Sequence, residues 1–152
     1  MQDDLNQSFG FVIHDVARLL RKNFDRRAQS VGLTRSQWFV LMHLRRQDGL
    51  RQTDLADLLE VRPISLTRLI DRLVKNAWVE RRSDPDDRRA NRVFLTKKAE
   101  PLLNRLSNLG KETREEALRG IPQEERERFM MTLLRIHATV TELPSATEKT
   151  KK

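Results

Sequence analysis

Apolar side chains recur every three to five residues through most of this chain, which is the spacing of amphipathic helices. The pattern predicts a first helix over residues 5–28, a second from Thr34 to Gly49 and a third over QTDLADLLEV. Three more are expected, over PISLTRLIDRLVKNAW, from Thr96 to Gly120 and from Pro122 to Leu143. The chain therefore reads as mainly helical.

Local signals set the expected ends of these helices. Gly32 stops the first, and Thr34 is placed to cap the second with its hydroxyl. Pro63 opens the fourth helix, since proline is tolerated at the first helical position. Thr96 is expected to cap the fifth. The expected buried sides of the third and fourth helices are Leu55, Ala56, Leu58, Leu59, Leu66, Leu69, Ile70 and Leu73.

A helix-turn-helix followed by a hairpin is predicted between residues 52 and 96. The third and fourth helices are short and joined by a tight turn, and the front of the second one carries basic and hydroxyl residues. WVERR and NRVFLT then have the composition of two antiparallel strands, so the segment between them is the tip of a wing. The residues expected to face DNA from the helix are Arg62, Ser65, Thr67, Arg68 and Arg72.

Charge singles out the same region. The chain carries a net charge of +8, and residues 62–98 hold 11 basic and five acidic side chains, an excess of +6. A clustered basic excess predicts a polyanionic partner, with nucleic acid ahead of a membrane surface. The absence of cysteine excludes a disulfide framework and a cysteine redox sensor, and it fits a reducing cytoplasm. No apolar run approaches the ~20 residues of a membrane helix.

The wing loop combines both signs of charge. Arg88, Arg89 and Arg92 supply cations that a narrow minor groove would attract. Asp87 is expected to hold a turn or to pair with an arginine and fix its direction. The alternative from the residues alone is a solvated hairpin loop without a function.

Enzymatic chemistry finds no support in the sequence. The three histidines are dispersed, and neither a nucleophile–base pair nor a glycine-rich phosphate loop is present. No cofactor is expected, and a metal-sensing variant would have few ligands.

The segments LADLLEV, LTRLIDRLVKNAWVERRSDPDDRRANRVFLT and KKAEPLL resemble the MarR family of winged-helix transcription regulators. The wing signature, Asp87-x-Arg89 followed after five residues by Leu95-Thr96, carries the resemblance. RRANR and LTKKAEPL are particularly similar to the SlyA branch of the family. The resemblance implies a homodimer on double-stranded DNA with a pseudo-palindromic operator, acting as a repressor that small aromatic acids or their thioesters release.

The resemblance also implies an arrangement of the whole chain. Residues 1–143 would form one domain, with a winged helix-turn-helix lobe over 34–98. The terminal helices, over 5–30 and 97–143, would intertwine with those of a partner as a dimer platform. The polar composition of residues 144–152 separately predicts a flexible tail.

Single residues keep two interpretations each. Arg68 matches the family's recognition-helix arginine and would contact a base, the alternatives being a phosphate contact or an ion pair with Asp71. His14, Arg18, Trp38 and Met42 match or lie beside a ligand pocket between the first helix and the DNA lobe. The alternative places Trp38 in the core and Arg18 at the dimer surface. A ligand-independent architectural DNA-binding protein of the same fold is the competing function.

Overall fold

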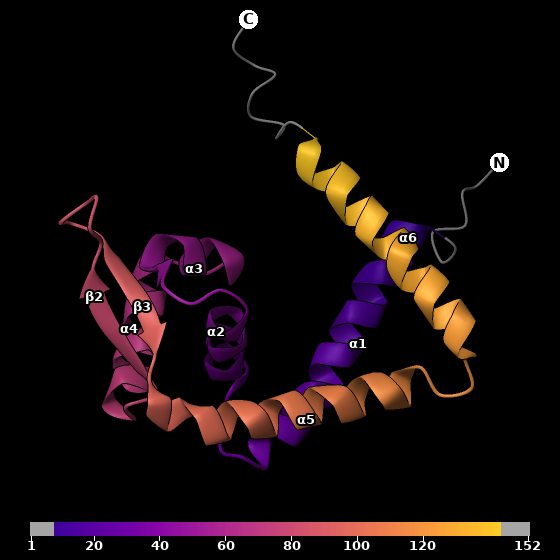
Figure 1. The fold of residues 1–152 in the computed structure, drawn as a ribbon, viewed down its shortest axis with the longest axis horizontal. Coiled ribbons are helices and arrows are strands. Elements are labelled where there is room, and N and C mark those ends of the chain that lie inside the picture. Colours follow the sequence, from indigo (N-terminus) through magenta and orange to yellow (C-terminus); the bar gives the residue numbers. More distant parts are fainter. Residues whose placement is uncertain (1–7, 144–152) are drawn as a thin grey trace, which may run out of the picture. The chain divides into compact units, whose positions relative to one another are not determined.

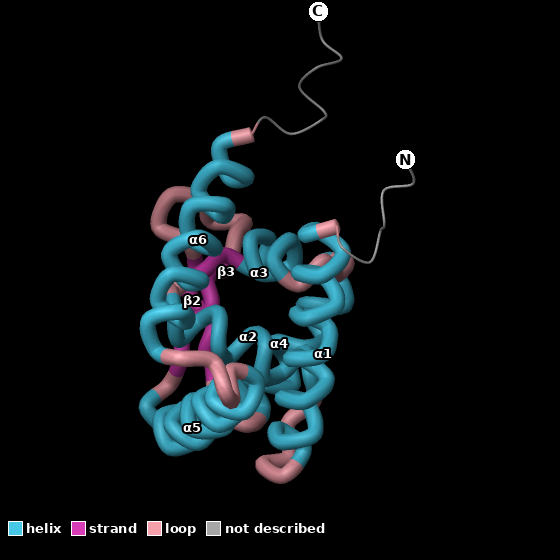
Figure 2. The backbone as a smooth tube through the Cα atoms, turned by 90° about the vertical axis from the view of Figure 1, so that its right-hand side faces the viewer, coloured by secondary structure: helices cyan, strands magenta, loops and turns pink. Residues whose placement is uncertain are grey.

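The computed structural model describes residues 8–143, which are mostly helical with a small antiparallel sheet (Figures 1 and 2). In chain order the elements are α1 Phe9–Gln29, α2 Arg35–Arg46, β1 Leu50–Arg51, α3 Gln52–Leu58, α4 Pro63–Lys75, β2 Val79–Ser83, β3 Asn91–Leu95, a 3-10 turn Lys97–Ala99, α5 Glu100–Ala117 and α6 Gln123–Glu142. The mainly helical fold with a hairpin wing is confirmed. The predicted start at Leu5 and the tail 144–152 lie outside the described residues.

The chain divides into two compact units, one up to Arg114 and one from Glu115. The first contains the helix-turn-helix and the wing. In the second, Arg126 closes the turn before α6, because its guanidinium donates to the carbonyl oxygens of Leu118 (2.7 Å) and Ile121 (2.8 Å).

Several predicted boundaries are confirmed. The hydroxyl of Thr34 accepts from the backbone N–H of Gln37, whose side chain in turn accepts from the N–H of Thr34, so α2 begins with a capping box. Pro63 is the first residue of α4. The second helix, however, ends at Arg46, three residues before the predicted stop at Gly49. Gly49 has φ +74°, and a Cβ there would stand 2.7 Å from Cε1 of Phe94, so the chain needs glycine where it turns into the sheet.

Several other predictions about these helices are wrong. The fourth helix ends at Lys75 instead of reaching Trp78, because Ala77 adopts φ 57° and Trp78 N–H bonds to the carbonyl of Leu73. Thr96 makes no cap, since its hydroxyl donates to the carbonyl of Ala77 at 2.5 Å. The third helix ends at Leu58 instead of reaching Val61, since Glu60 adopts φ 53°. Leu58, predicted to be buried, is exposed.

The sheet has the strand order β1–β3–β2, and both pairs are antiparallel. In the long pair, Val79 lies opposite Leu95 and Ser83 opposite Asn91. The two-residue strand β1 was not predicted, and it places Arg51 opposite Arg92. One hydrophobic core joins the sheet to the helices, and its fully buried members include Leu41, Leu44, Leu55, Leu66, Ile70, Leu73, Val79, Val93 and Leu106.

Most of the exposed large apolar side chains lie on two helices. On α1 these are Phe9, Phe11, Val12, Ile13, Val16 and Leu19, and on α6 they are Phe129, Met130, Met131, Leu134 and Val140. None of the helices between residues 8 and 143 is both long and apolar enough to cross a membrane.

Candidate nucleic-acid interface

Helix α4 presents a polar face opposite the side that enters the core. Leu66, Leu69, Ile70 and Leu73 are buried, whereas Arg62, Ser65, Arg68 and Arg72 are exposed. Thr67 is half-buried, and its hydroxyl donates to the carbonyl of Pro63 at 3.0 Å, so this hydroxyl is already used within the helix. The sequence therefore placed the basic face of α4 correctly, with Thr67 at its margin.

Asp71 does not hold Arg68 as the alternative interpretation supposed. Its carboxylate pairs with Nη1 of Arg81 at 2.7 Å. Arg68 stays exposed on the open side of α4. This arrangement leaves the guanidinium of Arg68 available for a base or a phosphate.

Arg81, on β2, connects three elements through one guanidinium. Its Nε donates to the side-chain oxygen of Gln52 at 2.6 Å, at the start of α3. Its Nη2 donates to the carbonyl of Thr67 at 3.2 Å, and its Nη1 pairs with Asp71. Because Thr67 and Asp71 belong to α4, this side chain fixes the wing strand against the recognition helix.

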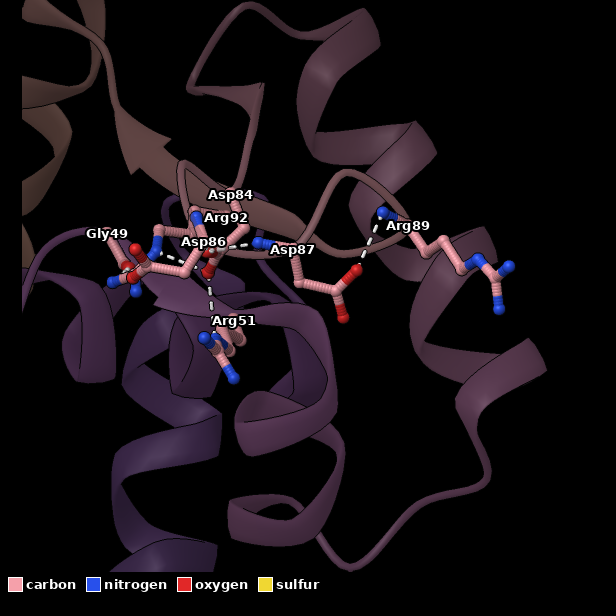
Figure 3. A network of polar contacts seen from close by, with 7 residues as sticks. All are labelled: Gly49, Arg51, Asp84, Asp86, Asp87, Arg89 and Arg92. Carbon is pink, nitrogen blue, oxygen red and sulfur yellow. Dashed lines mark hydrogen bonds and ion pairs between the residues drawn. The ribbon is translucent and has the colours of Figure 1, made fainter.

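A buried carboxylate holds the base of the wing. The side chain of Asp84 is fully buried, and its Oδ2 accepts from Nε of Arg51 at 2.8 Å and from Nε of Arg92 at 2.7 Å. Its Oδ1 accepts from the backbone N–H groups of Asp86 (2.8 Å) and Asp87 (3.2 Å). Figure 3 shows Asp84 enclosed by these groups. The backbone bond from Asp86 and the two arginines lower the pKa of Asp84 to about 2, against the opposing effect of burial.

The tip of the wing is shaped by Asp87. Its Oδ1 accepts from the backbone N–H of Arg89 at 2.9 Å, and its carbonyl accepts from the N–H of Ala90. Asp87 therefore holds a turn, one of its two predicted roles. Arg88 and Arg89 are exposed beyond it, and the guanidinium of Arg89 points away from the Asp84 cluster (Figure 3).

Arg92 does not belong to the tip, where the sequence placed it. Besides its bond to Asp84, it donates from Nη1 to the carbonyl of Gly49 at 3.3 Å. Its place on β3 opposite Arg51 explains why, since both arginines approach the same carboxylate. Arg92 is therefore paired with Asp84 at the base of the wing.

The recognition helix and the wing enclose a small hollow. Its volume is about 170 Å³, and its lining includes Pro63 and Thr67 of α4 together with Arg89 and Asn91 of the wing. Of the predicted DNA-binding residues, Thr67 and Arg89 line this hollow.

A second hollow, of about 480 Å³, contains only one of the four predicted ligand residues. His14 lines it, together with Arg21, Phe39 and the turn residues Leu59, Glu60 and Val61. Arg18, Trp38 and Met42 are not among its lining residues. The structure thus does not gather the predicted four residues in this cleft, and Arg21 and Phe39 supply a cation and a ring instead.

Trp38 occupies the core position that the alternative interpretation gave it. It is 8% exposed, its Nε1 donates to Asp25 at 2.8 Å, and its ring meets that of Phe24 edge-on with 4.5 Å between centroids. Arg18 is exposed and bonds to Asp15 through Nε at 2.9 Å.

Comparisons with known proteins agree with this geometry. The MarR family model matches residues 33–90, which span the helix-turn-helix and most of the wing. The crystal structure of the transcriptional regulator PA3341 is 34% identical over 89% of this chain and 99% of that one, with a TM-score of 0.76. The chain belongs to the MarR family.

Two further structures extend the likeness. Wild-type MarR from E. coli in its apo form is 26% identical over 84% of this chain and 95% of its own, with a TM-score of 0.74. The transcriptional regulator SlyA is 23% identical over 90% and 96%, with a TM-score of 0.73, and shares the fold. As a MarR-family member, this protein is a DNA-binding transcriptional regulator built on a winged helix-turn-helix.

Most of the residues that sequence reasoning missed position other residues, and one, Arg21, lines the second hollow. Asp84 was counted only among the loop charges, and Arg51, Arg81 and Arg21 carried no motif. One signal was available for Asp84: an Asp-Pro-Asp segment at a hairpin end is a typical Asx-turn sequence. Nothing in the local sequence indicated which arginines face a carboxylate across the sheet.

The free energy of unfolding of this MarR-family protein should depend on pH through Asp84. Because its folded-state pKa lies near 2, below the ordinary value of 3.8, ionised Asp84 stabilises the fold above about pH 4. That contribution is lost as the pH falls from about 4 towards 2. Asp84→Asn should therefore lower the free energy of unfolding near neutral pH, and the deficit should shrink on acidification. Urea unfolding followed by circular dichroism, repeated at several pH values, measures the free energy of unfolding of wild type and variant.

Asp86→Asn is the matched control, since it removes an exposed carboxylate two residues away. It should keep the wild-type pH dependence. An Asp84→Asn deficit that is the same at every pH would contradict the assignment.

Proposed function

We propose that this protein is a homodimer that places α4 of each subunit in the major groove of a pseudo-palindromic operator. The wing reaches the adjacent minor groove through Arg88 and Arg89. The observation that carries this proposal is that exposed arginines stand on the polar face of α4 and at the tip of the wing, on the two elements that flank one small hollow. Half-sites one helical turn apart would match the two recognition helices.

The internal ion pairs support this proposal. Of the acidic residues between 62 and 98, Asp71 pairs with Arg81, Glu80 with Arg82, and Asp84 with Arg51 and Arg92. The carboxylates nearest the sheet are thus neutralised within the lobe. The outward cations, Arg62, Arg68, Arg72, Arg88 and Arg89, then dominate the surface that DNA would meet.

Arg68 and Arg89 should differ in what they contribute. Arg68→Ala should cost ~1–3 kcal/mol on the preferred site and relax base preference, because a guanidinium in the major groove reads guanine. Arg89→Ala should weaken binding to all sequences alike and reduce the salt slope by about one unit, as for a backbone contact. Gel-shift titrations over several salt concentrations, with preferred and scrambled duplexes, measure both. Loss of affinity in Arg68→Ala without any change in preference would make Arg68 a phosphate contact.

A second copy of the chain is the proposed occupant of the exposed apolar faces of α1 and α6. Phe9 is 68% exposed and Leu134 is 61% exposed, although water is a poor environment for both. α6 has no fully buried residue among those described. Burying these side chains in a dimer interface would stabilise the dimer by roughly 25 cal/mol per Å² of apolar surface removed from water.

Leu134→Glu should convert the dimer into a monomer and abolish tight operator binding, because it places a charge in the proposed interface. Sedimentation velocity reports the mass, and gel shift reports the affinity. Thr132→Glu adds the same charge to an exposed position of the same helix and should stay dimeric. A wild-type protein that sediments as a monomer yet binds its operator tightly would contradict the dimer.

We further propose that the protein is a repressor released by a small aromatic acid or its thioester, bound in the cleft beside His14. Arg21 would pair with the carboxylate, and Phe39 would pack against the ring. A hundredfold loss of operator affinity needs ~2.7 kcal/mol of coupling, within the usual allosteric range. The ligand must therefore bind the DNA-incompetent arrangement better than the competent one.

Arg21→Gln should bind operator normally but release it only at higher effector concentration. The measurement is a titration of salicylate-like and cinnamate-like acids and their thioesters against the operator complex. Arg18→Gln is the discriminating control and should respond as wild type does. A defect in Arg18→Gln alone would move the ligand towards Trp38 and Met42, as the sequence predicted. A wild-type complex that no acid releases would favour the ligand-independent DNA-binding protein.

A further inference from the structure

An apolar side chain stands in the middle of the charged face of α4. Ile64 is the second residue of the helix and 59% exposed. Its neighbours Arg62, Ser65 and Arg68 are polar and exposed as well. Ile64 is not among the residues that line the hollow between α4 and the wing.

Helical geometry fixes the direction of Ile64. At about 100° per residue, the buried Leu66, Leu69, Ile70 and Leu73 centre on the side opposite Ile64. Arg68 follows Ile64 by four residues, so both lie on the same face, one turn apart. The first turn of a recognition helix is the part that contacts base edges. Ile64 therefore occupies the position from which a side chain would meet a base.

The chemistry of isoleucine selects one feature of the major groove. Ile64 offers neither a donor nor an acceptor, so it cannot read the polar base edges. The C5-methyl of thymine is the apolar group exposed in that groove. A β-branched side chain in a helix is nearly fixed at χ1, so little rotamer freedom is lost when it packs.

We propose that Ile64 is a specificity-determining residue that packs on a thymine methyl in each half-site, beside the base pair that Arg68 contacts. The inference rests on the proposed DNA-binding mode and adds an apolar contact to it. Removing that methyl from the DNA should weaken binding about fourfold per half-site, equivalent to ~0.8 kcal/mol for one buried carbon. Removing the methyl from both half-sites should weaken binding about fifteenfold.

The experiment removes the methyl from the DNA and the side chain from the protein. The full-length protein first selects its preferred duplex from a random pool. Each thymine of that duplex is then replaced by deoxyuridine, symmetrically in both half-sites, which deletes only the methyl. Wild type should lose about fifteenfold at one position, whereas Ile64→Ala should bind the two duplexes equally. Ile64 is exposed, so this variant should retain its circular dichroism spectrum and its melting temperature.

Val74→Ala is the matched control, since Val74 is also an exposed β-branched residue of α4, ten residues further on. It should show the wild-type methyl profile. The inference would be overturned if no thymine-to-deoxyuridine replacement weakened binding by wild type, or if Ile64→Ala lost affinity at the same position. Either result would leave sequence-selective binding intact. A wild-type protein that selects no sequence would overturn the proposed function and this inference together.

Discussion

The DNA-facing lobe depends on the ion pairs and hydrogen bonds that surround the buried carboxylate of Asp84. A fully buried charge is tolerated only with close partners, and Asp84 has two arginines and two backbone N–H groups. These partners come from β1, from β3 and from the loop itself, so one side chain joins the short strand, the hairpin and its tip. This gives two of the three acidic residues of the wing loop a structural role, while the carboxylate of Asp86 stays exposed. Asp84 turns inward and Asp87 holds the backbone, which leaves Arg88 and Arg89 outside.

Arg81 extends the same principle from the wing to the recognition helix. With Gln52, Thr67 and Asp71 as partners, it ties β2 to α3 and α4. A wing and a helix that are already held in place lose less conformational freedom on binding than two loose elements would. Arginines that are paired within the lobe thus fix its geometry, whereas the exposed arginines of α4 and the wing tip remain for a polyanion. Sequence composition alone cannot separate these two groups, because both consist of the same residue type in the same window.

Sequence reasoning succeeded where the signal is local and failed where it depends on pairing across the fold. Helical periodicity, the Thr34 cap, Pro63 and the hairpin strands all act within a few residues, and the structure confirms them. The ends of α3 and α4 were harder, since Glu60 and Ala77 take the left-handed conformation in which glycine is usual. β1 is too short for any periodicity, and it decides that Arg51 and Arg92 share Asp84. The cleft likewise selects Arg21 over Arg18 through packing of α1 against other helices, which no spacing along α1 reveals.

The proposed effector cleft and the proposed DNA face share a short piece of backbone. Leu59, Glu60 and Val61 line the cleft, and the next residue, Arg62, is the N-cap of α4. Glu60 has φ 53°, a conformation that costs a non-glycine residue energy and that only the surrounding structure maintains. A ligand that displaced this turn would move the front of α4, where Arg62 and Ile64 stand. Thermodynamic linkage makes this effect reciprocal. If the ligand lowers the affinity for operator DNA by some factor, bound operator lowers the affinity for the ligand by the same factor. Coupling between the two sites therefore needs no long pathway: the turn between α3 and α4 belongs to both.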